Sequence, residues 1–140
     1  MLTFKNSELA PVINFLTDVP LKGRTSRGRT KLVMVLSLKH QELMEDIEEL
    51  KKEVGINESL SDEEQAIPEN QEKIENYNRE FRQLLSEEIS ANFDEYSQFL
   101  EHLITGLHAC EVEFSGQDSL VYDKVLDQLE QEKAGNEDEK

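Results

Sequence analysis

The chain has 140 residues, of which 31 are acidic and 15 are Lys or Arg, so its formal net charge at pH 7 is −16. A chain of this length suits one domain with a sizeable core, and its negative charge disfavours binding to nucleic acid or anionic membranes except through a local basic surface. The single cysteine precludes an internal disulfide, and the first residues lack the apolar run of a signal peptide. We therefore expect a cytoplasmic protein with no membrane contact.

The first twenty residues predict a short strand followed by a short helix. Residues 2–4 alternate apolar and polar side chains, as an edge strand does. Asn6 or Ser7 is then expected to cap a helix, with Pro11 in the first turn, where proline costs little. This helix should end before Pro20.

A long amphipathic helix is predicted to follow a loop. The two glycines of residues 21–28 favour a loop, so we expect the helix to begin at Ser26 or Thr30 and to stop at Gly55 as its C′ residue. The apolar stripe of this helix has three-four spacing, as in an element that buries one face. The stripe consists of Val33, Leu36, His40, Leu43, Ile47, Leu50 and Val54.

A second long helix is expected to lie antiparallel to the first. Residues 56–70 are polar and acidic, which predicts a mobile linker. The apolar stripe resumes beyond it at Ile74, Tyr77, Phe81 and Leu84. Because each stripe needs a partner, we expect the two helices to pack together and the chain to self-associate through helix packing.

The remaining chain predicts two further helices and two short alternating segments. Residues 89–93 and 111–114 alternate as strands do, a third helix spans 96–110, and a motif resembling a capping box at 115–118 starts the last helix. Residues 132–140 are expected to form a disordered acidic tail. The predicted fold is mainly α, with an antiparallel pair of long helices, shorter helices and two or three short strands, in one domain over 1–131.

The candidate binding site is a basic run. No acid occurs between Pro20 and Gln41. Such a run suits a phosphate, a nucleic-acid backbone or an acidic protein surface, although the same cations could instead neutralise the protein's own acids. No aromatic residue lies between Phe15 and Tyr77, so the stacking platforms of single-strand binders are missing from it. The predicted partner- or phosphate-binding residues are Lys22, Arg24, Arg27, Arg29 and Lys31.

Catalytic and metal-binding motifs are incomplete in this sequence. Gly23-x-x-x-x-Gly28-Arg29-Thr30 matches a phosphate-binding P-loop except at Arg29, where that loop requires Lys, and no buried strand is predicted before it. Glu-x-x-Glu pairs recur on both long helices, but without the Glu-x-x-His pairs of di-iron bundles. His108 is the only base near Cys110 and is expected to point elsewhere. We therefore predict no catalytic residues, no metal, no cofactor and no enzymatic activity.

Two segments carry a family resemblance. These are Leu21-Lys22-Gly23-Arg24-Thr25-Ser26-Arg27-Gly28-Arg29-Thr30-Lys31-Leu32, and Phe114-Ser115-Gly116-Gln117-Asp118 leading into Tyr122-Asp123-x-x-Leu126. The chain resembles, over about residues 1–131, a family of small uncharacterised proteins encoded by phages and prophages of Gram-positive bacteria. The resemblance implies a phage-encoded protein that acts in the bacterial host cytoplasm or during virion assembly, and it implies no particular activity.

Three functional hypotheses follow from the sequence. The first is a non-enzymatic phage accessory protein that binds another protein, of the phage or the host, through helix faces and the basic loop 22–31. The second is nucleic-acid or phosphate binding by that loop, which predicts affinity that falls steeply with salt. The third, suggested by the net charge of −16, is an acidic mimic of DNA that inhibits a host enzyme.

Overall fold

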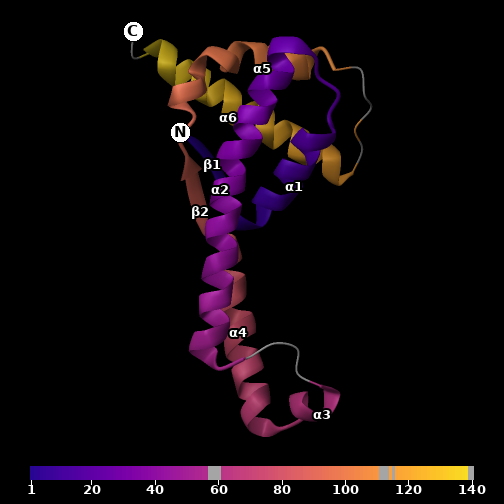
Figure 1. The fold of residues 1–140 in the computed structure, drawn as a ribbon, viewed down its shortest axis with the longest axis vertical. Coiled ribbons are helices and arrows are strands. Elements are labelled where there is room, and N and C mark those ends of the chain that lie inside the picture. The colour runs from indigo at the N-terminus through magenta and orange to yellow at the C-terminus, as the bar shows by residue number, and fades with distance from the viewer. Residues whose placement is uncertain (57–60, 111–113, 115, 139–140) are drawn as a thin grey trace.

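A computed structural model describes residues 1–56, 61–110, 114 and 116–138. The fold is mainly α, with one two-stranded antiparallel sheet (Figure 1). The elements in chain order are β1 (Leu2–Lys5), α1 (Asn6–Asp18), α2 (Gly23–Val54), α3 (Asp62–Gln65), α4 (Pro68–Ser86), β2 (Glu88–Ala91), the 3₁₀ helix η1 (Asp94–Phe99), α5 (Leu100–His108) and α6 (Gln117–Asp138). The predicted fold class is confirmed, including the antiparallel pair formed by α2 and α4 and two of the short strands.

One end of the molecule holds most of the hydrophobic core, and we call this part the body. The first half of α2 packs there against α1, α5 and η1, while α6 covers α1 and α5 (Figure 1). Strand β1 pairs with β2 so that Leu2 lies opposite Ala91 and Phe4 opposite Ile89. Leu2 and Phe4 are fully buried, so the sheet contributes its apolar face to the same core.

The second half of α2 extends away from the body, and α4 returns beside it (Figure 1). We call residues 42–54 of α2, together with α3 and α4, the arm. Among its described side chains only Leu43 and Ile47 are buried, and α4 has no buried side chain. Two helices alone cannot enclose a seam between them, so Tyr77 and Phe81, whose rings stack 5.5 Å apart, remain half-exposed.

Asn6 joins the arm to the body. Its backbone N–H donates to the carbonyl of Glu87 at 2.9 Å, and its side-chain Nδ2 donates to the carbonyl of Leu84 at 2.8 Å. The prediction that Asn6 or Ser7 caps α1 was wrong. The Asn6 side chain is used at this junction, and the Glu8 carboxylate accepts the free N–H of Lys5 at 2.7 Å, so α1 begins at Asn6 itself.

The predicted loop over residues 21–28 was also wrong, because α2 begins at Gly23. Gly28 is a helical residue at the crossing of α2 with η1 and α5. A Cβ atom at Gly28 would lie 2.9 Å from Cβ of Phe99 and 3.2 Å from Cγ of Leu103. Tertiary packing therefore outweighs the poor helix propensity of glycine at this position. The predicted stop at Gly55 is confirmed, since its φ of 78° is left-handed and its N–H bonds the carbonyls at the end of α2.

The C-terminal half differs from prediction in several details. The predicted helix over 96–110 is divided, with η1 preceding α5. The expected linker 56–70 contains α3, and α6 continues to Asp138 through residues for which a disordered tail was predicted. The predicted strand over 111–114, except Phe114, and Ser115 of the capping motif lie outside the described residues.

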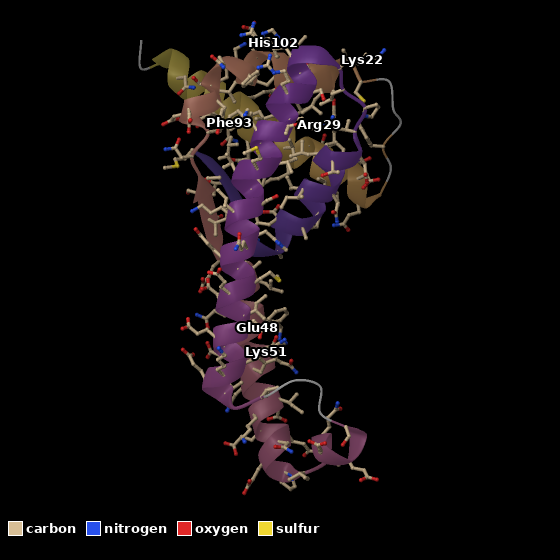
Figure 2. The ribbon with its side chains drawn as sticks, in the orientation of Figure 1. Lys22, Arg29, Glu48, Lys51, Phe93 and His102 are labelled. Carbon is tan, nitrogen blue, oxygen red and sulfur yellow. The ribbon has the colours of Figure 1, made fainter. Side chains whose placement is uncertain are left out.

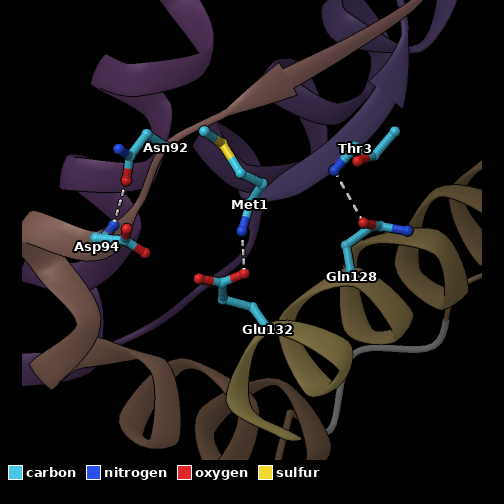
Figure 3. Close-up of polar contacts among 6 residues, drawn as sticks. All are labelled: Met1, Thr3, Asn92, Asp94, Gln128 and Glu132. Carbon is cyan, nitrogen blue, oxygen red and sulfur yellow. Dashed lines mark hydrogen bonds and ion pairs between the residues drawn. The ribbon is translucent and has the colours of Figure 1, made fainter. Parts of the chain in front are cut away.

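Helix α6 extends because the N-terminal strand lies along it. The backbone N–H of Thr3 donates to Oε1 of Gln128 at 2.9 Å, and the amino group of Met1 pairs with the carboxylate of Glu132 (Figure 3). Gln128 and Glu132 are both buried. These polar contacts hold the last turns of α6 on the body, a long-range effect that a charged, glycine-containing sequence did not reveal.

Candidate anion-binding face at the start of helix α2

The five predicted site residues lie at the N-cap and in the first three turns of α2, but they divide into two groups. Arg29 belongs to the fold. Its guanidinium donates to the carbonyl of Val19, just beyond the end of α1, and to Oγ of Ser26 at 2.8 Å. Because Arg29 is half-buried and satisfies a carbonyl that α1 leaves free, it fixes the connection between α1 and α2 rather than presenting charge to solvent.

Lys31 is also occupied within the fold. Its Nζ lies 5.5 Å from the centre of the Tyr96 ring, within the range of a cation–π interaction. The side chain is half-buried between α2 and η1. Two of the five predicted site residues therefore serve, at least in part, to pack the body.

The other three cations are exposed, and we call Lys22, Arg24 and Arg27 the cation face. Among the described residues, none of these three side chains takes part in a hydrogen bond or an ion pair. Lys22 is the N-cap of α2, and the first turn contains no acid and no side-chain cap. The backbone N–H groups of that turn are thus left beside three cations, an arrangement that suits a carboxylate or a phosphate.

The P-loop pattern over residues 23–30 does not form a P-loop. The segment is helical and follows α1, not a buried strand. Of its two glycines, Gly28 serves packing, as does Gly106 on α5, where a Cβ atom would collide with Cγ2 of Thr25, whereas Gly23 has a left-handed φ of 57° and open space at its Cβ position. The close crossing of α2 over α5 accounts for Gly28 and Gly106 without a nucleotide.

Two features beside the cation face were not predicted from sequence. His102 is exposed at the same end of the molecule as Lys22 (Figure 2), and its carbonyl accepts a hydrogen bond of 3.3 Å from Oγ1 of Thr25. A hollow of about 580 Å³ adjoins Lys22. Its lining is Pro20, Leu21, Lys22, Thr25, Gly106, Ala109 and Cys110. No local motif marks these residues, because α5 reaches α2 only through the tertiary fold.

The other candidate metal-binding and reactive side chains do not come together in one site among the described residues. Within the described part of the chain, no group of three or more His, Cys, Asp or Glu side chains is suited to holding a metal ion. Burial raises the pKa of the Tyr122 phenol, with smaller contributions from Cys110, Asp123 and Glu130. Because that phenol donates a 2.9 Å hydrogen bond to the carbonyl of Leu107, it serves to hold α6 on α5.

Residues 1–136 match the family DUF1617, which is described as protein of unknown function. The chain belongs to the DUF1617 family. The match spans both the cation face and the arm of this DUF1617 protein. No curated protein and no solved structure matched the chain. Across the described residues of this DUF1617 protein, no helix combines the length and apolarity needed to cross a bilayer.

Proposed function

We propose that this DUF1617 protein is a non-enzymatic phage or prophage accessory protein that acts in the bacterial host cytoplasm by binding another protein. In this proposal, the cation face contacts an acidic surface of the partner. One observation carries the proposal: Lys22, Arg24 and Arg27 are exposed and unpaired within the described structure, although the chain contains 31 acids. Among the described residues, no acid pairs with these three side chains, which favours the proposal over self-neutralisation, the competing explanation for the basic run.

A protein partner fits this geometry better than a nucleic acid. Three cations clustered at one helix start match a local group of carboxylates, and guanidinium groups bind carboxylates in a bidentate manner. A nucleic acid would have to approach a molecule of net charge −16, which repels a polyanion at long range.

The test is capture of partners from induced host cells by the tagged protein, with and without nuclease. The variant Lys22→Ala/Arg24→Ala/Arg27→Ala should lose a stoichiometric protein partner that survives nuclease. Lys5→Ala/Lys52→Ala/Arg79→Ala removes the same charge from exposed positions elsewhere and should retain that partner. If both variants retain it, the cation face is not the contact.

Nucleic-acid or phosphate binding by the cation face is the second candidate, and the free N–H groups of the first turn of α2 favour it. With three cations involved, the logarithm of the association constant for duplex DNA should fall with the logarithm of salt concentration with a slope of about −2.7. Nuclease would then remove everything captured by the wild-type protein.

Inhibition of a host enzyme by mimicry of DNA is favoured by a separate observation. Many acids stand on the folded helices of the arm, six on α2 from Glu42 onward and four on α4. Competition with DNA for a DNA-binding host enzyme would support this candidate. Such competition should persist in the Lys22→Ala/Arg24→Ala/Arg27→Ala variant, because the mimic uses acids only.

A further inference from the structure

A groove runs along the arm between α2 and α4, far from the cation face. Its volume is about 260 Å³, which is below the roughly 300–1,000 Å³ of pockets that enclose small-molecule ligands. The α2 side consists of Asp46, Glu49, Leu50 and Glu53. The α4 side consists of Glu80, Gln83, Leu84 and Glu87.

The two sides of the groove repeat one pattern. On α2 the lining residues follow the spacing i, i+3, i+4, i+7, which places them along one face for two turns, about 10 Å. On α4 Glu80, Gln83 and Leu84 follow i, i+3, i+4, and Glu87 stands at i+7 just past the helix end, in extended backbone. The third position of each set is a leucine, and Leu50 and Leu84 are both half-buried. The groove therefore has an apolar floor between two rows of polar groups, and its length and direction match a third helix laid on the hairpin.

The walls carry five carboxylates without a cation. Among the described residues, no ion pair involves any of the five. Three of the five basic residues of the arm have partners outside the groove. Lys51 lies 3.5 Å from the Glu48 carboxylate, Arg79 donates to Asn76 at 2.8 Å, and Arg82 donates to the carbonyl of Asn78 at 3.2 Å. Figure 2 shows Glu48 and Lys51 together on the arm.

We propose that this groove binds a helix of a partner protein, one whose apolar stripe is flanked by Lys or Arg. The apolar stripe would cover Leu50 and Leu84, and the flanking cations would lie against the carboxylates on both walls. A second copy of the arm does not fit, because its own carboxylates would face these five and repel them. The inference concerns a different surface from the cation face and does not depend on the function proposed for it.

The probe is an 18-residue helical peptide with leucines at i, i+3, i+4 and i+7 spacing and lysines on both sides of that stripe. Binding to the full chain is measured by calorimetry at two salt concentrations. Two control peptides share its length: one replaces every lysine with glutamine, and one keeps the composition but scrambles the order so that no stripe exists. The first peptide should bind, and each control should bind at least about tenfold more weakly.

A pair of variants locates the contact. Glu49→Gln/Glu53→Gln/Glu80→Gln removes three carboxylates from the groove and should weaken peptide binding about tenfold, as expected for the loss of three exposed charge pairs. The matched control Glu45→Gln/Glu72→Gln/Glu75→Gln removes three exposed charges from the same helices outside the groove and should bind as the wild type does. Circular dichroism confirms that both variants keep their helices.

Three results would overturn the inference. These are equal weakening by the two variants, equal binding of the scrambled peptide, and no binding of the first peptide at millimolar concentration. The first two would mean that the arm attracts cations without a defined docking site.

Discussion

The body and the arm share one helix, α2, yet they bury their side chains in different ways. In the body α2 is covered by α1, η1 and α5, and Leu32 and Leu36 are almost fully buried. In the arm the same helix has α4 as its main neighbour, and no side chain of α4 is buried. Burial of apolar surface is the main source of folding free energy, so the body should carry most of the stability and the arm should open locally at lower cost.

The difference in burial accompanies a difference in charge. The described helices of the arm contain thirteen acids and five bases, whereas the N-cap and the first three turns of α2, in the body, contain five bases and no acid. A two-helix hairpin with a half-covered apolar seam and one acidic face has surface available for a partner. In the body, the charged surface that remains available to a partner is the cation face, because Arg29 and Lys31 are engaged in contacts within the fold.

The largest effect should come from shortening a core side chain of the body. Leu103 is fully buried at the crossing of α5 with α2, and Leu103→Ala should lower the free energy of unfolding by about 3–5 kcal/mol. Leu50→Ala in the arm, where the side chain is half-buried, should cost about 1 kcal/mol. Denaturant titration of both variants checks the contrast, and equal costs would contradict it.

Asn6→Ala should loosen the junction between the arm and the body. The change removes one of the two donors to the carbonyl of Leu84, which still accepts from the N–H of Glu87 at 3.2 Å, so we expect a loss of about 0.5–1.5 kcal/mol in unfolding free energy. The backbone bond from Asn6 to Glu87 remains, so the strand pairing should survive. Faster amide exchange at the end of α4, with unchanged exchange in α5, is the specific signature of this junction.

Gly28→Ala should disturb the crossing of α2 with η1 and α5. The added methyl group must displace Phe99, which should cost about 1–3 kcal/mol and outweigh the gain in helix propensity. Gly135→Ala on α6 is the matched control, because no atom lies within 4 Å of its Cβ position. Thermal unfolding should show a lower Tm for the first variant and an unchanged or slightly higher Tm for the second.

The smallest effect concerns pH. The pKa of Tyr122 is raised in the folded state, so the folded protein holds this proton more tightly than the unfolded chain, whose tyrosine pKa is about 10. The stabilisation is complete below pH 10 and is lost as the pH rises through the folded pKa. The stability advantage of wild type over Tyr122→Phe should therefore shrink between neutral pH and pH 11. An advantage that grows over this range would contradict the shift.

Local sequence patterns predicted the elements whose determinants are local. The stripe from Val33 to Val54, the stop at Gly55 and the alternation at residues 2–4 all appear as expected. The strand predicted over 89–93 is also present, although it ends at Ala91. Predictions were wrong where contacts with residues distant in the sequence determine the local structure. Gly28 is helical because η1 and α5 pack closely against it. The side chain of Asn6 donates to the carbonyl of Leu84 instead of capping α1 as predicted.

The prediction of the candidate site was incomplete for the same reason, because local sequence does not reveal contacts with distant residues. The sequence located all five cations at the start of α2 but could not separate Arg29 and Lys31, whose partners Val19 and Tyr96 are contacts of the fold, from the three exposed cations. The groove of the arm was invisible for a similar reason. The spacing of Asp46, Glu49 and Glu53 is ordinary on one exposed helix and becomes a wall only when α4 supplies the other side.

Native-state hydrogen exchange of the full chain, resolved by peptide mass spectrometry, tests the division into body and arm most directly. We predict that amides of α4 exchange through local opening at a free energy at least about 2 kcal/mol below that of amides in α5, which should approach the global unfolding free energy. Equal protection of α4 and α5 would show that the arm and the body unfold as one unit, and would contradict the account.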